Sequence, residues 1–145
     1  MTVNRMQIVR EARSWIGTPY RHQASLRGVG CDCLGLVRGV WRAVIGNEPE
    51  QVPPYARDWA EASGDEQLAD AGLRHFVPVG ANEYRAGDVL LFRWRAGFPA
   101  KHAAIVTSES TMVHAHDGAA VTEVAILPWW KRRLAFAFRF PGVVD

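Results

Sequence analysis

The spacing of hydrophobic residues changes once along this chain, from a helical to a strand-like period. Apolar side chains recur every three to four residues over 5–16 and again over 33–45, which predicts two amphipathic helices. After Gly87 the apolar runs are short and bounded by turn residues, and they predict strands over 89–94, 102–107, 111–114, 119–124 and 134–140. Helices followed by strands with hairpin-length connections predict an α+β fold, with the helices packed on an antiparallel sheet of about five to six strands.

Composition and charge restrict the class of protein further. The chain has 145 residues, 48% of them hydrophobic, which suits one domain with its own core. We therefore expect a single domain over 1–145, with a polar, proline-bearing insertion at about 47–87 that has no catalytic duty and one short helix near 65–73. A net charge of +2 argues against a dedicated nucleic-acid binder. No apolar run reaches the roughly 18 residues of a membrane span, so none is expected.

The two cysteines, Cys31 and Cys33, flank a single aspartate. One intervening residue makes a relaxed disulfide between them unfavourable, so we expect two free thiols. Asp32 is placed to cap the second helix, because its carboxylate can accept from the free N–H groups of the first turn. Cys33 then lies inside that turn, where the helix macrodipole favours a thiolate, and Gly35 clears space beside the thiol. The alternative is an inert, buried helical cysteine.

Histidines supply the candidate partners of a reactive thiol. His102 begins one expected strand and His114 ends the next. Two such residues can meet directly across an antiparallel ladder, one as a base and the other as the group that orients it. His22, in a loop, and His75, beside a helix end, are interpreted as surface residues.

A metal site is the competing interpretation of the histidine-rich segment. Residues at i and i+2 of a strand project to one side, so a cation could be held by His114, His116 and Asp117. The match to a full metal signature is poor, because a third strong ligand would have to come from His102. A chelator would separate this alternative from a thiol mechanism.

Five sequence blocks, in order, resemble the NlpC-type cell-wall cysteine peptidases. They are Gly17-Thr-Pro-Tyr20, Gly30-Cys-Asp-Cys-Leu-Gly-Leu-Val37, Gly87-Asp-Val-Leu-Leu-Phe92, His102-Ala-Ala-Ile-Val106 and Met112-Val-His-Ala115. The resemblance covers about residues 5–140, and Trp130-Lys-Arg-Arg133 is similar to the family's closing segment. The departures from the family pattern are Leu34 in place of Ser, the extra Cys31, and Ala103-Ala104 in place of Val-Gly.

The resemblance implies a papain-like fold and a peptidase site. Position by position, Cys33 matches the family nucleophile, His102 its base and His114 the third, orienting residue. Tyr20 matches a tyrosine that helps to stabilise the oxyanion. The implied reaction is hydrolysis of peptidoglycan stem peptides through an acyl-enzyme, often at the bond from D-glutamyl to a diamino acid, with no cofactor and no metal. The oxyanion and substrate side of the site is expected to comprise Tyr20, Asp32 and Gly35.

The route by which such an enzyme reaches the cell wall is a separate question. The residue sequence of the Gly30–Leu36 block resembles that of the phage-tail and gene-transfer-agent branch of the family. The first residues lack the apolar stretch of a secretory signal. We therefore expect a protein made in the cytoplasm, built into a phage-like tail beside hub or tip proteins, and acting on the periplasmic wall. The Trp129-Trp130 pair and residues 47–87 are candidate docking surfaces. The alternative for the tryptophans is that they belong to the core, which we expect of at least one of them. Two alternatives stay open: a structural tail protein that uses the fold only for docking, and a cytoplasmic peptidase of muropeptide recycling.

Overall fold

The computed structural model describes residues 2–52 and 66–145. The helices are α1 (Arg5–Ser14), α2 (Cys33–Val44), α4 (Gln67–His75) and α5 (Pro128–Lys131). The strands are β1 (Ser25–Leu26), β2 (Gly30–Cys31), β3 (Val77–Val79), β4 (Val89–Phe92), β5 (His102–Ser108), β6 (Thr111–His114), β7 (Thr122–Ala125) and β8 (Leu134–Arg139). The fold is therefore α+β, as the change of hydrophobic period predicts. Among the described helices, none is long and apolar enough to span a membrane.

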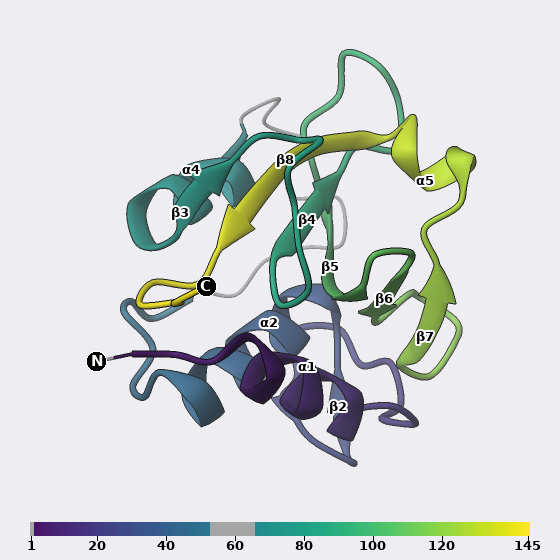
Figure 1. Cartoon of the computed structure of the whole chain (residues 1–145). Coiled ribbons are helices and arrows are strands. Elements are labelled where there is room, and N and C mark those ends of the chain that lie inside the picture. Colours follow the sequence, from purple (N-terminus) through teal and green to yellow (C-terminus); the bar gives the residue numbers. More distant parts are fainter. Residues whose placement is uncertain (1, 53–65) are drawn as a thin grey trace.

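Six strands form one antiparallel sheet in the order β3-β8-β4-β5-β6-β7 (Figure 1). The last strand, β8, lies between β3 and β4, so the C-terminal segment forms an inner strand of the sheet rather than an edge. β1 and β2 form a separate two-stranded ribbon beside α2. The termini also meet, because Val3 and Val143 form a parallel bridge.

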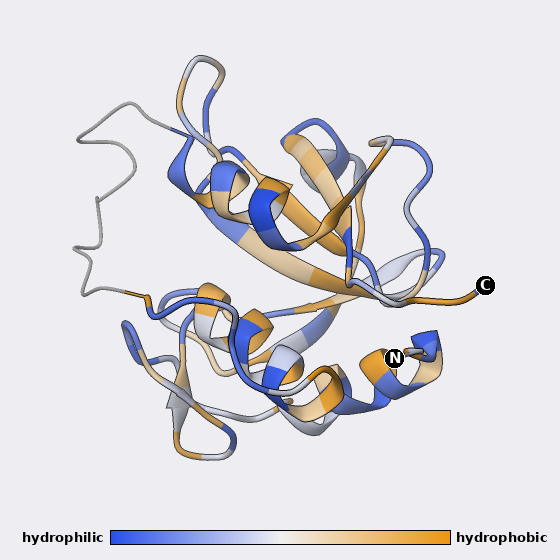
Figure 2. Cartoon of the chain, turned by 90° about the vertical axis from the view of Figure 1, so that its left-hand side faces the viewer, coloured by the Kyte–Doolittle hydropathy of each residue, from blue (hydrophilic) through white to orange (hydrophobic). Residues whose placement is uncertain are grey.

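The two N-terminal helices cover one face of the sheet and supply much of the main core (Figures 1 and 2). Ile8 and Ala12 of α1 are fully buried, as are Leu36 and Val40 of α2. The helices approach closely at Gly39, where a Cβ would lie 2.0 Å from the ring of Trp15. A side chain at that position would therefore push the helices apart and displace α2, which carries Cys33.

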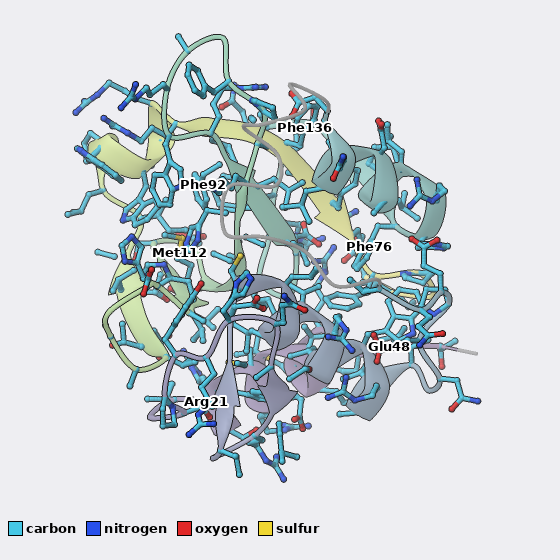
Figure 3. All side chains as sticks on the ribbon, turned by 180° about the vertical axis from the view of Figure 1, so that it is seen from behind. Arg21, Glu48, Phe76, Phe92, Met112 and Phe136 are labelled. Atoms are coloured by element: carbon cyan, nitrogen blue, oxygen red, sulfur yellow. The ribbon has the colours of Figure 1, made fainter. Side chains whose placement is uncertain are left out.

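The opposite face of the sheet carries a smaller core. Phe92 and Met112, labelled in Figure 3, are fully buried there, and Trp130 of α5 packs against the cluster. The ring of Trp130 contacts Phe92 edge-on, with centroids 4.9 Å apart. Its neighbour Trp129 is 43% exposed. Trp130 thus packs against the core while partly exposed, and Trp129 is the more exposed of the two.

The Gly87-Asp88 pair fixes the start of β4 to the rest of the fold. The Asp88 carboxylate is fully buried and accepts from Arg5 at 3.1 Å and from Arg139 at 3.0 Å. It also accepts from the backbone N–H of Arg85 at 2.8 Å. Because Arg5 belongs to α1 and Arg139 to β8, one carboxylate joins a helix to two strands of the sheet.

The 47–87 segment contributes a helix and a strand of the main sheet to the fold. Its short helix lies at Gln67–His75, two residues later than expected, and is followed at once by β3. No strand was expected in this polar, proline-bearing segment, and β3 contains Pro78. A proline is compatible with an edge strand, and β3 is the edge of the sheet. Residues 53–65 of this segment lie outside the described residues.

The remaining differences from the expected elements are at ends and in short segments. α1 ends at Ser14 because Gly17 turns with a φ of +92°, and Ile16 is 45% exposed rather than on the buried face. β4 ends at Phe92, two residues early, and β7 begins at Thr122, three residues late. The elements β1, β2 and α5 span only two to four residues, too few to carry a periodic signal.

Candidate active site

Cys33 is the first residue of α2, and Asp32 caps the helix as expected. The Oδ1 atom of Asp32 accepts from the backbone N–H of Gly35 at 2.7 Å, and its Oδ2 accepts from the N–H of Gln23 at 2.7 Å. The carboxylate is almost fully buried, so it holds both the helix N-terminus and the preceding loop. The thiol of Cys33 points to the start of β5, where it donates to the Lys101 carbonyl with 3.8 Å between sulfur and oxygen.

Gly35 has a different role from the expected one of clearing space beside the thiol. A Cβ at Gly35 would lie 1.9 Å from the carbonyl oxygen of Ala24 and 3.1 Å from Oδ1 of Asp32. The Gly35 carbonyl also accepts from the Ser25 hydroxyl at 2.6 Å. The glycine is therefore needed so that the 20–31 loop can pack against the first turn of α2, and its effect on Cys33 is indirect.

His102 and His114 meet through their rings, as a pair diagonal to one another rather than directly opposite. The register pairs Ala104 with His114, and His102 pairs with Phe92 on the other side of β5. The expectation of a directly opposed pair is therefore wrong, because the residue opposite His114 is Ala104, two positions after His102. The contact still forms, because diagonal neighbours are within reach of long side chains. Nε2 of His102 lies 2.9 Å from Nδ1 of His114, and both residues are buried.

One cleft of about 340 Å³ brings the expected residues together. Cys33, His102 and Tyr20 all line it. Tyr20 is held there by a parallel bridge to Cys31. Of the expected site residues, Asp32 also lines the cleft, while His114 lies behind His102 and Gly35 lies within the helix.

The electrostatics of the site differ from the expected thiolate. Burial, followed by the neighbouring Asp32 carboxylate, raises the pKa of the Cys33 thiol to about 12. Backbone hydrogen bonds at the start of α2 act in the opposite direction and are outweighed. Burial, and then the charges of His114 and His116, hold the pKa of His102 well below its usual value. Burial, followed by the charge of His116, also lowers the pKa of His114, to about 4. Each of these pKa shifts favours the neutral form of its group, so the resting site disfavours a thiolate–imidazolium pair.

Cys31 is free but buried, with no exposed surface. Burial, with smaller contributions from Asp32 and Cys33, raises the pKa of its thiol to about 12. It does not line the cleft that contains Cys33. Cys33 is only half-buried, so it is the cysteine that a substrate can reach.

The metal interpretation finds no arrangement of ligands to support it. Among residues 2–52 and 66–145, no group of three or more His, Cys, Asp or Glu is placed to hold an ion. His116 is exposed, and its Nδ1 donates to the backbone carbonyl of Asp117 at 3.2 Å. Its ring lies 5.6 Å from that of His102, so its position is beside the pair rather than in it.

Two tryptophans that the sequence analysis did not place in the site surround the base. The ring of Trp130 stacks on His102 with centroids 5.6 Å apart and 25° between planes, and it meets His114 edge-on at 5.2 Å. Trp94 contacts His102 at 5.1 Å. The available signal was that Trp94 ends the apolar run expected to form a strand, and that Trp130 begins the block that resembles the family's closing segment. Only the tertiary fold brings both to one histidine.

Other residues of the cleft were also missed by sequence reasoning. His22, expected at the surface, is half-buried and lines the cleft, with its Nδ1 4.0 Å from Oδ2 of Asp32. His75, also expected at the surface, is half-buried but lies outside this cleft, with its Nε2 3.5 Å from a carboxylate oxygen of Glu50. Leu34, which replaces the usual serine, and Leu68 of α4 complete an apolar side of the cleft. Nothing in their spacing distinguishes these residues from ordinary loop or core positions.

Comparison with known proteins gives the family. The model of the NlpC/P60 family matches residues 17–139, which is most of the chain. The chain therefore belongs to the NlpC/P60 family. No curated protein matches it.

Solved structures agree with the family assignment. The NlpC/p60 domain of the peptidoglycan hydrolase SagA is 25% identical and has a TM-score of 0.64, with 95% of this chain and 100% of that one covered. An NlpC/P60 family protein from Bacillus cereus is 19% identical with a TM-score of 0.70, over 97% of this chain and 41% of that one. NlpC2 from Trichomonas vaginalis is 15% identical with a TM-score of 0.67, over 94% of this chain and 46% of that one. The chain thus spans less than half of the latter two proteins, which share its papain-like fold.

Proposed function

We propose that this protein is a cysteine peptidase that hydrolyses an amide bond in peptidoglycan stem peptides. The observation that carries the proposal is one cleft that holds the Cys33 thiol at a helix N-terminus and, behind His102, a buried hydrogen bond to His114. Membership of the NlpC/P60 family and the similarity to a domain of a peptidoglycan hydrolase support the choice of substrate.

In this proposal the hydrogen bond between the histidines indicates which nitrogen of His102 acts as the base. Nε2 of His102 is engaged with Nδ1 of His114 at 2.9 Å, so Nδ1 of His102 is the nitrogen left for the thiol. For that nitrogen to accept a proton, Nε2 of His102 must carry hydrogen and donate it to His114. His114 in this proposal therefore orients the ring and fixes its tautomer.

The reaction then follows in two steps. Nδ1 of His102 takes the proton of Cys33 as the sulfur attacks the carbonyl carbon, and the same proton goes to the departing amine. This leaves a thioester on Cys33. Water attacks the thioester, with His102 accepting its proton, and releases a carboxylic acid and the free thiol.

The resting site begins as a neutral pair, because the pKa of Cys33 is raised to about 12 and that of His102 is lowered. In this proposal the base takes the proton as the sulfur attacks. In this proposal the developing oxyanion accepts hydrogen bonds from backbone N–H groups at the start of α2 and from the hydroxyl of Tyr20. A donor arranged in this way favours the charged transition state over the neutral resting state.

Release of soluble peptides from purified peptidoglycan tests the proposal. Wild-type protein and the Cys31→Ala variant should release them, and Cys33→Ala should not. A chelator should leave the activity unchanged, whereas a thiol alkylating agent should abolish it. Activity that survives in Cys33→Ala, or that is lost on chelation, would overturn the assignment.

We further propose that the enzyme acts as a component of a phage-like or gene-transfer-agent tail that opens the wall locally. The resemblance of the Gly30–Leu36 block to that branch supports this role, and the exposed Trp129 offers a contact for a tail hub or tip protein. Mass spectrometry of purified particles tests it. An active enzyme found only in the cytosol would favour muropeptide recycling, and an inactive chain found in particles would favour a structural tail protein.

A further inference from the structure

A second depression, rich in arginine, lies beside the catalytic cleft. It has a volume of about 420 Å³. The depression, here called the arginine pocket, is lined by Arg93, Trp94, Arg95, Ala96, Arg132, Arg133 and Leu134. Four of these seven residues are arginines and none is acidic.

Two segments distant in sequence form this pocket side by side. One is the chain after β4, and the other is the junction between α5 and β8, both at the top of Figure 1. The backbone N–H of Arg93 donates to the carbonyl of Arg133 at 3.0 Å, which ties the two segments together. The pocket is therefore a feature of the folded sheet rather than of one loop.

Two of the arginines are held in place by the protein. Arg93 donates to Oε2 of Glu66 at 3.0 Å and to the Phe98 carbonyl at 2.6 Å. Arg133 donates to the Trp129 carbonyl at 2.9 Å, and its guanidinium lies 3.7 Å from the centre of that residue's ring. Side chains fixed in this way lose little further entropy when they bind a ligand.

The other two arginines have no carboxylate partner within the part of the chain that the structure describes. Arg95 lies over the ring of Phe98 at 5.5 Å, and Arg132 is exposed directly after α5, at the C-cap of that helix. Glu66 is the one acid paired with this group of four in the described residues. The pocket thus has a local excess of positive charge, although the whole chain carries only +2. Such a concave surface attracts anions, and the arginine fork fits an oxyanion with two parallel hydrogen bonds.

Trp94 connects the pocket to the catalytic cleft, because it lines both. Its ring centroid is 5.1 Å from that of His102, so the indole of Trp94 separates the arginine pocket from the base. An extended peptide advances about 3.3–3.6 Å per residue. A substrate chain held at Cys33 and extended past Trp94 would therefore carry the neighbouring residues of the same peptide towards the arginines.

We propose that the arginine pocket is a substrate subsite that binds a free carboxylate of the stem peptide. This inference rests on the proposed function. A stem peptide that contains a glutamyl residue keeps one carboxylate there that its chain does not use, and another at its C-terminus. The short reach past Trp94 favours an anion belonging to the peptide in the cleft over one on a separate wall polymer. Arg95 and Arg132, which have no carboxylate partner, make the contact.

Binding to the inactive protein tests the subsite without turnover. Titration calorimetry of the Cys33→Ala variant uses a synthetic stem tripeptide with free carboxylates and the same peptide with each carboxylate converted to a carboxamide. The free acid should bind at least about tenfold more tightly, because a hydrogen-bonded charge is lost in the amide. Adding Arg132→Gln or Arg95→Gln should remove most of that difference. The control is Arg10→Gln, an exposed arginine on α1 with the same change of charge, which should keep it.

A polyglycerol phosphate tests the other source of anions. If it binds through Arg132 while the two peptides bind equally well, the pocket takes wall phosphate and the subsite proposal is overturned. Equal effects of Arg132→Gln and Arg10→Gln would overturn it as well, since they would show a general charge effect.

Kinetics separate this inference from the proposed function. With active enzyme, Arg132→Gln should raise KM for the free acid about tenfold with little change in kcat, and should not affect the amidated peptide. Cleavage of both peptides with equal KM by wild type would reject the subsite and keep the peptidase. Binding of the free acid through Arg132 without any cleavage would reject the peptidase and keep the anion site.

Discussion

Replacing Asp32 by asparagine should lower the stability of the protein and increase the reactivity of its thiol. Both carboxylate oxygens accept backbone N–H groups at 2.7 Å, one from Gly35 and one from Gln23. Asparagine has one carbonyl oxygen and remains a good helix cap, so the bond to Gly35 can persist. The N–H of Gln23 would then face an amide nitrogen that cannot accept.

The size of the stability effect follows from that single lost acceptor. A buried donor left without a partner costs about 1–3 kcal/mol. For a domain of this size, that loss lowers the melting temperature by about 3–12 °C. Urea denaturation and thermal melting measure it, with Glu109→Gln as the control, because Glu109 is an exposed acid in the turn between β5 and β6.

The thiol should respond in the opposite sense. The Asp32 carboxylate is the second largest cause of the raised pKa of Cys33, after burial. Removing its charge should lower that pKa from about 12 and speed alkylation by iodoacetamide at a fixed pH. The assay is the pH dependence of alkylation rate in a Cys31→Ala background. A thiol pKa that stays unchanged or rises in Asp32→Asn would refute the reasoning.

Three further predictions concern the histidine pair. His114→Ala should lower kcat/KM by roughly a hundredfold or more, while His116→Ala should have a mild effect; equal losses would remove the orienting role of His114. The folded-state pKa of His114 is about 4, below the unfolded value of 6.5. The unfolded chain therefore binds this proton more readily, so the protein keeps its full free energy of unfolding above pH 6.5 and loses part of it as the pH falls towards 4. That loss is about 3 kcal/mol and should be reduced in His114→Asn in acid unfolding curves, and parallel curves for the two proteins would contradict it. Trp130→Ala should admit water to the pair and raise the pKa of His102, shifting the acidic limb of the pH–rate profile upward, whereas Trp130→Phe should retain the profile; a change in stability without that shift would show a structural role only.

Much of the fold could be predicted from local pattern. The stripes of α1 and α2 and the apolar runs of β4, β5 and β6 are periodic over enough residues to indicate their type. The cap at Asp32 depends on neighbours within one turn, so the sequence places Cys33 correctly at the start of α2. β3 and its place at the edge of the sheet were not predictable in this way, because its partner β8 is distant in sequence.

The candidate site likewise has features that local sequence predicts and features that only the tertiary structure sets. The sequence determined the residue types, the order of the motifs and the position of Cys33 on its helix, since these depend on chemistry and spacing along the chain. Tertiary structure alone decided the diagonal contact of His102 with His114, the neutral state of the thiol, and the two tryptophans around the base. Register, burial and electric field arise from atoms brought together from distant segments, and no local spacing encodes them. Gly35 is an example: the sequence identifies the glycine, but only the fold shows that the absence of a Cβ makes room for the backbone of Ala24 rather than for the adjacent sulfur.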